Sequence, residues 1–162
     1  MKIVADAGPV IGLAKIGKIS LLEKLAEEVL IPPIVHKELF GKIGFESNQI
    51  DLALRDFVNV VELGSSEIKE DERTANLGEG EKQCIYLASS LKKDVLLLID
   101  DRAARKAADK FYIPKTGLAG FLIIAKSRGL INNVGSLLSE LRSAGYWLSD
   151  EVIAVARKLA GE

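Results

Sequence analysis

Acidic side chains recur along this chain at points where they could act together. Asp6 and the pair Asp100-Asp101 each follow a short run of apolar residues, whereas Glu38 and Glu81 lie in segments with helical spacing. Carboxylate oxygens, with no set of His or Cys beside them, are the ligands preferred by hard ions such as Mg²⁺ and Mn²⁺. Such ions activate water and stabilise the attacking and leaving oxygens of an in-line displacement at phosphorus. These residue types therefore favour metal-assisted hydrolysis of a phosphodiester bond.

The same acids carry a cost for the fold. Carboxylates that are gathered without matching cations repel one another and raise each other's pKa, which destabilises the folded chain unless a cation offsets the repulsion. A divalent metal is the usual solution. The acids are far apart in the sequence, so the hypothesis requires a fold that brings them to one place.

The run from Val95 to Ile99 indicates what that fold is. It holds five consecutive Val, Leu and Ile residues without a polar break, which is typical of a strand buried on both faces of a helix-covered parallel sheet. Lys2 to Ala5 is a second β-prone run, and it ends on Asp6. In open α/β sheets, ligands bind at the carboxyl ends of the strands. We therefore expect an α/β fold with both acid positions at that edge.

Glu38 lies in a predicted helix from Pro33 to about Lys42. Ile34 and Val35 precede it by four and three residues, so helical spacing places Glu38 with the apolar face. The alternative is a solvent-exposed pair between Glu38 and Lys42 at i,i+4.

Helical periodicity also separates two glutamates of the segment 78–91. Glu81 precedes Cys84 and Ile85 by three and four residues, which puts it on the inward stripe, whereas Glu79 shares its face with Lys82. Glu81 is therefore the candidate for chemistry. Glu79 is explained by the favourable effect of a negative charge in the first turn of a helix.

Asp100 and Asp101 need not both be ligands, because one of them can serve as the N-cap of the helix that follows. Arg102, Arg105 and Lys106 fall at i, i+3 and i+4 of that helix and form a small cationic face. This face is either a solvated surface or a phosphate contact beside the metal site.

The remaining segments complete the expected alternation of helices and strands. Cys84 and Trp147 are expected to be apolar anchors, Cys84 in the core and Trp147 in the core or an interface. Apolar periodicity and turn residues predict further helices at 9–16, 20–27, 46–57, 117–128, 134–144 and 150–160, and strands at 29–31, 58–63 and 111–113.

Composition limits the function classes. With 162 residues, 48% of them hydrophobic, the chain is expected to form one domain over 1–162. The 22 basic and 23 acidic residues nearly cancel, so a nucleic acid would have to be held by a local patch or by metal. The single cysteine excludes an internal disulfide and suits a reducing compartment, the cytoplasm. No signal peptide or membrane span is predicted.

Five blocks of the chain resemble the PIN domain family, in the family's order and over nearly the whole length. More closely, they are similar to a prokaryotic PIN-like group described as predicted nucleic-acid-binding proteins. The resemblance implies a three-layer α/β/α Rossmann-like sandwich with a central parallel sheet and a metal-dependent ribonuclease site like that of VapC-type toxins. The blocks are DAGPVIGLAKI, VLIPPIVHKEL, LGEGEKQCIYLA, LLLIDDRAARKAA and TGLAGFLIIAKSRGLI.

Position by position, the resemblance carries the family's acids onto this chain. The first aspartate falls on Asp6, the helix glutamate on Glu38, and the third acid on Glu81, where many relatives have aspartate. The fourth falls on Asp101 or Asp100, and counting back from the following helix slightly favours Asp101. All five residues are thus candidate ligands of Mg²⁺ or Mn²⁺, and Asp6, Glu38, Glu81 and Asp101 are the predicted catalytic set.

The chain departs from the family pattern at Ala7, where many PIN domains have Ser or Thr; the hydroxyl of Thr116 could replace the one that is missing.

The resemblance implies an endoribonuclease acting on single-stranded RNA, with the toxin of a toxin–antitoxin pair as one role. RNA, a small antitoxin and a second copy of the chain are the implied partners. The alternative is a PIN-like module that binds RNA or protein without cutting. A haloacid dehalogenase-type phosphatase ranks lower, because Gly8 stands where its second aspartate belongs.

Overall fold

The computed structural model describes residues 1–68 and 70–162. Within these ranges the strands form one sheet in the order β3-β2-β1-β4-β5, and every pairing is parallel. The strands are β1 (Lys2–Ala5), β2 (Glu28–Ile31), β3 (Val58–Val60), β4 (Val95–Leu98) and β5 (Lys115–Thr116).

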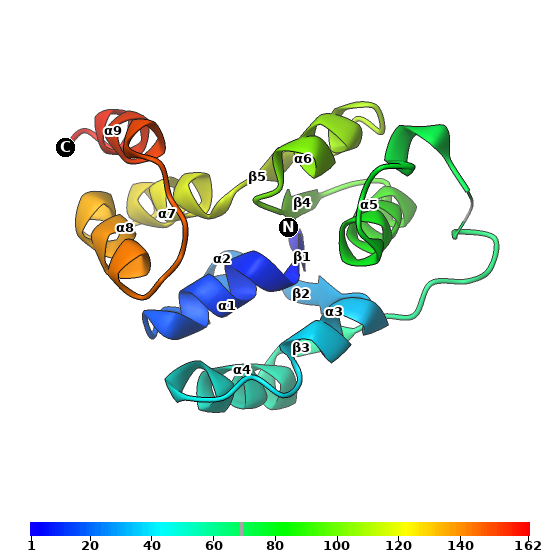
Figure 1. Ribbon diagram of the computed structural model, residues 1–162, viewed down its shortest axis with the longest axis horizontal. Coiled ribbons are helices and arrows are strands. Elements are labelled where there is room, and N and C mark those ends of the chain that lie inside the picture. Colours follow the sequence, from blue (N-terminus) through cyan, green and yellow to red (C-terminus); the bar gives the residue numbers. More distant parts are fainter. Residues whose placement is uncertain (69) are drawn as a thin grey trace.

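Helices flank this sheet, which gives the predicted three-layer α/β/α arrangement (Figure 1). The last three helices contact one another and form a group at one side of the molecule (Figure 1). No helix in the described ranges is long and apolar enough to cross a membrane. The helices are α1 (Ala7–Lys15), α2 (Ser20–Leu25), α3 (Pro33–Leu39), α4 (Phe45–Asp56), α5 (Glu79–Leu91), α6 (Arg102–Asp109), α7 (Leu118–Ser127), α8 (Val134–Ser143) and α9 (Asp150–Leu159), with a 3₁₀ turn at Glu72–Thr74.

The central strands are buried on both faces, as their uninterrupted apolar runs predict. Ile3, Val4, Leu97 and Leu98 are all 0% exposed, and Val4 pairs with Leu97 across the sheet. Cys84 is also fully buried in the core, which confirms its expected role.

The strand order reverses between β1 and β4, and this reversal creates the place for a site. From β1 the chain runs to β2 and β3 on one side, while β4 and β5 lie on the other. The carboxyl ends of the two strands around such a switch point border a crevice. Asp6 directly follows β1, and its backbone N–H donates to the carbonyl oxygen of Leu98 at 3.0 Å. The two strand ends that carry acids are thus tied together.

The last strand does not lie where the sequence predicted it. The segment 111–113 is a turn, because the N–H groups of Phe111 and Ile113 both donate to the carbonyl of Ala108 and Tyr112 has a positive φ of 57°. The chain becomes a strand only after Pro114, whose carbonyl accepts from Leu97 N at 2.9 Å. With two residues and no apolar run, β5 carries no sequence signal of its own.

Candidate active site

Asp6 is the central acid of the candidate site. It occupies the N-cap position of α1 in extended backbone conformation, so its carboxylate leaves the sheet at the switch point. Burial is the main cause that raises the pKa of Asp6 to about 6, and the charges of Glu81, Glu38 and Asp100 raise it further. A backbone hydrogen bond from Ala7 acts in the opposite direction. The pKa of Asp6 therefore responds to the charges of the other three acids, which lie near its carboxylate.

Glu38 reaches this place from α3, across the contact with α5. A Cβ atom on Gly80 would lie only 2.9 Å from Glu38 Oε1, so the glycine provides the room for the carboxylate. Burial first and the charge of Glu81 second raise the pKa of Glu38. Glu38 is nevertheless exposed, and the charge of Lys42 acts on its pKa in the opposite direction. The two residues do not form an i,i+4 pair on one helix, because α3 ends at Leu39.

Glu81 and Glu79 are separated as helical spacing indicated. Glu81 is half-buried in the first turn of α5, and its carboxylate folds back onto Gly78. Glu79 is exposed and pairs with Lys82 at 3.4 Å.

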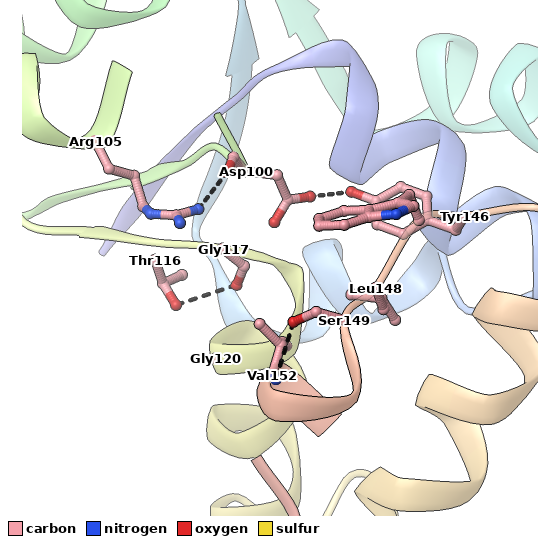
Figure 2. Close-up of a pocket in the computed structure, with 11 residues that line it drawn as sticks. Asp100, Arg105, Thr116, Gly117, Gly120, Tyr146, Leu148, Ser149 and Val152 are labelled. Atoms are coloured by element: carbon pink, nitrogen blue, oxygen red, sulfur yellow. Dashed lines mark hydrogen bonds between the residues drawn. The ribbon is translucent and has the colours of Figure 1, made fainter. Parts of the chain in front are cut away.

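Asp100 and Asp101 have different surroundings. Asp101 is exposed and caps α6, its Oδ1 accepting from Ala104 N at 2.7 Å. Asp100 turns toward the switch point, where Oδ1 accepts from Leu118 N at 2.8 Å and Oδ2 accepts from the hydroxyl of Tyr146 (Figure 2). Since the charge of Asp100 raises the pKa of Asp6, the geometry favours Asp100 as the fourth acid, against the slight preference for Asp101.

Tyr146 is a residue of the site that the sequence did not reveal. It lies between α8 and α9, and its ring packs so closely on α1 that a Cβ on Gly12 would be 2.8 Å from Tyr146 Cε2. Burial and the neighbouring Asp100 raise the pKa of the Tyr146 hydroxyl, so it remains a hydrogen-bond donor to Asp100. The glycines Gly8 and Gly12, one turn apart on α1, are the only sequence sign of such a close approach in this part of the chain.

The three cations of α6 do not act as one face. The half-buried guanidinium of Arg105 donates to the carbonyl oxygens of Ile99, at 3.3 Å, and Asp100, and so fixes the end of β4 (Figure 2). Arg102 and Lys106 are exposed and form no ion pair within the described residues. Thr116 donates its hydroxyl to the carbonyl of Gly117 at 3.1 Å.

Comparison with known proteins agrees with this fold. A family model described as PIN domain matches residues 2–162. The chain belongs to the PIN domain family. A solved PilT N-terminus domain protein from the hyperthermophilic archaeon Sulfolobus solfataricus is 20% identical, with a TM-score of 0.54 over 75% of this chain and 91% of that one; this likeness supports the fold. A search of curated proteins found no match. PIN domains are usually nucleases and typically use divalent metals, which gives the coarse function class.

The acids of this PIN domain suit such an ion by donor type. All four are carboxylates, and none of them forms an ion pair with Lys or Arg within residues 1–68 and 70–162. As they stand, no three acidic, His or Cys side chains in those ranges converge closely enough to form a finished metal cluster. The two glutamates have long side chains with several accessible rotamers. Asp6, Glu38, Glu81 and Asp100 would therefore hold the ion.

Proposed function

We propose that this PIN domain is a Mg²⁺- or Mn²⁺-dependent endoribonuclease that hydrolyses phosphodiester bonds of single-stranded RNA. One observation carries the proposal. Burial raises the pKa of Asp6 to about 6, and Glu38, Glu81 and Asp100 lie near enough for their charges to raise it further. None of these four carboxylates forms an ion pair within residues 1–68 and 70–162. The unpaired negative charge favours a divalent ion, and that ion class supports phosphoryl chemistry.

The four acids differ in what they contribute. Asp6 and Asp100 extend from adjacent parallel strands and fix the position of the site. Glu38 and Glu81, from α3 and α5, complete the ligand set and leave one carboxylate oxygen to orient the attacking water. A bound ion supplies charge neutralisation and lowers the pKa of that water.

Substrate binding would rest on local cations, since the net charge is −1. Arg102 and Lys106, both exposed on α6 beside the strand end, can contact phosphates. Arg105 is committed to the carbonyl oxygens of Ile99 and Asp100, so we assign it to positioning the strand end.

The toxin role within a toxin–antitoxin pair, with a small antitoxin as partner, is the biological setting that we propose from the resemblance to VapC-type toxins. Expression of the wild-type chain should then arrest growth, and co-expression of a small antitoxin encoded beside its gene should relieve the arrest. Asp6→Asn should not arrest growth. Growth arrest by the Asp6→Asn variant would show that the arrest does not depend on nuclease activity, and it would contradict the toxin role.

A second candidate is a PIN-like module that binds RNA without cutting it. It is favoured by the engagement of both oxygens of Asp100 in hydrogen bonds and by the replacement of a common hydroxyl by Ala7. The hydrogen bonds reduce the lone pairs that Asp100 can offer to an ion, and Ala7 provides no hydroxyl group to support the site.

Cleavage of single-stranded RNA in Mn²⁺ distinguishes the two functions. We expect Asp6→Asn and Glu81→Gln to reduce cleavage to background while RNA binding persists, because the binding cations are untouched. Glu79→Gln is the matched control on the outer face of α5 and should cleave as the wild type does. Wild-type protein that binds RNA but leaves it intact with both metals would establish the module instead.

A further inference from the structure

A cavity lies beside the acids. It has a volume of about 500 Å³, which falls within the size range of small-molecule sites in proteins. Of the four acids, Asp100 alone is among the described residues that line it (Figure 2). The cavity is thus adjacent to the candidate catalytic site and joined to it through one carboxylate.

Most of the cavity wall is apolar and aromatic. Leu148 and Val152 contribute aliphatic surface, and Trp147 lines the same space. Trp147 was expected to be a core or interface anchor, but it is 84% exposed and so does not belong to the core. A large aromatic side chain that borders a cavity and remains accessible is well suited to stack on a flat ring.

Polar groups converge at the end of the cavity nearest the acids. Asp100 is held there by Tyr146 and Leu118 N, and Arg105 is held by the carbonyl of Ile99. A Cβ on Gly117 would lie 2.7 Å from Asp100 Oδ1 and 3.2 Å from Arg105 Nη1. Gly117 therefore keeps this polar end open, and the groups around it are fixed before any ligand enters.

We propose that this cavity binds one unpaired nucleobase of single-stranded RNA, stacked on Trp147, so that the adjoining phosphodiester lies at the acids. The inference rests on the proposed function, because it extends the same substrate away from the acids. Single-stranded RNA is recognised by stacking of splayed bases on aromatic side chains. A base fits the combination of an aromatic wall and a polar end, and any occupant of this cavity lies next to Asp100.

A metal-free binding experiment tests the base site separately from catalysis. Trp147 is the only tryptophan in the sequence, so all tryptophan fluorescence comes from this residue of the cavity wall. In EDTA, we expect a ten-nucleotide single-stranded RNA to quench the fluorescence, and an abasic ribose-phosphate strand of equal length to quench it far less.

Anisotropy of labelled RNA supplies the affinity of variants that lack the fluorophore. Trp147→Ala should weaken binding by about tenfold, the size of one lost stacking contact, and Trp147→Phe should weaken it less. Tyr112→Ala is the matched control, because Tyr112 is 94% exposed and is not among the residues that line the cavity. It should bind as the wild type does.

The outcomes separate the base site from the nuclease. RNA that binds without quenching, or equal affinities of Trp147→Ala and Tyr112→Ala, would overturn the base site even if the protein cleaves RNA in Mn²⁺. Quenching with the predicted affinity loss would support the base site even if no cleavage occurs. A fluorescence change that follows protein concentration without RNA would assign Trp147 and the exposed Val155 of α9 to contact between two copies, and would also overturn it.

Discussion

The acids at the strand ends and the acids on the helices are held in different ways. Asp6 follows a strand whose end is tied to β4 through Leu98, and both carboxylate oxygens of Asp100 accept hydrogen bonds. Glu38 and Glu81 accept no such bond within the described residues and instead rest against glycines of α5. The strand ends thus provide a fixed half of the site, and the helices provide an adjustable half.

This contrast explains how the four acids can lie near one another without converging into a metal cluster in the metal-free protein. Two fixed acids alone leave an ion with too few ligands, whereas four fixed acids would carry the full repulsion in the metal-free protein. We infer that the two glutamates, which accept no side-chain hydrogen bond within the described residues, let the charges separate until a cation joins them. Breaking the fixed half should therefore affect stability most, and altering the adjustable half should affect mainly metal binding and cleavage.

The largest effect on stability is expected from the ionisation of Asp6. Its pKa is raised from 3.8 to about 6, so between these pH values the unfolded chain loses its proton while the folded chain keeps it. Metal-free stability should fall as the pH rises through this window and level off above it, with a total change of at most about 3 kcal/mol.

Asp6→Asn should remove this pH dependence and leave the metal-free protein at pH 7 at least as stable as the wild type. Urea unfolding at pH 4 and pH 7 measures both effects. If the free energy of unfolding changes equally between pH 4 and pH 7 in the two proteins, the ionisation of Asp6 is not the cause of the pH dependence.

The adjustable half can be perturbed with a single methyl group. In Gly80→Ala the new Cβ would lie 2.9 Å from Glu38 Oε1, so the carboxylate must move. We expect cleavage to fall by about a hundredfold, the cost of a misplacement of about 1 Å. The helix itself should gain about 0.5–1 kcal/mol, because alanine is the better helix former.

Paired measurements of kcat/KM and of Tm test this separation of activity from stability. Ser89→Ala, on the exposed side of α5, is the control and should change neither quantity greatly. A Gly80→Ala protein that cleaves normally would mean that Glu38 does not require the space that Gly80 leaves open.

A smaller effect is expected where the fixed half is held by Tyr146. Tyr146→Phe removes the donor to Asp100 Oδ2 and should cost about 1.5–3 kcal/mol of metal-free stability, as for a hydrogen bond to a charged group. Because the same oxygen becomes free for an ion, Mn²⁺ should raise the Tm of this variant more than that of the wild type. The reverse order would show that the hydroxyl supports metal binding rather than competing with it.

The sequence predicted the fold and the positions of the acids for a clear physical reason. The apolar runs before Asp6 and before Asp100 are typical of buried strands, and parallel strands bring their carboxyl ends to one edge. Helical spacing distinguished Glu81 from Glu79 because one of them shares its face with the core. These are local patterns, and they persist in the folded chain.

What the sequence could not predict depends on tertiary contacts. Asp100 and Asp101 are adjacent, and the sequence does not indicate that Asp101 caps α6 through Ala104 N while Asp100 accepts from Leu118 N and from Tyr146. Tyr146 is distant in sequence from every acid of the candidate site, and nothing local shows that its loop returns to the end of β4. Gly80 looked like part of a helix start, although it makes room for Glu38 from another helix.

The central claim is that Asp6, Glu38, Glu81 and Asp100 hold one divalent ion, and Mn²⁺ binding to Asp100→Asn and Asp101→Asn tests it most directly. The pair is matched, because asparagine is as good an N-cap as aspartate and Asp101→Asn should keep α6 intact. We expect wild-type protein and Asp101→Asn to gain about 2.7 kcal/mol of stability at a Mn²⁺ concentration one hundred times the Kd. Asp100→Asn should gain far less. An unchanged gain in Asp100→Asn, with loss of the gain in Asp101→Asn, would contradict the account.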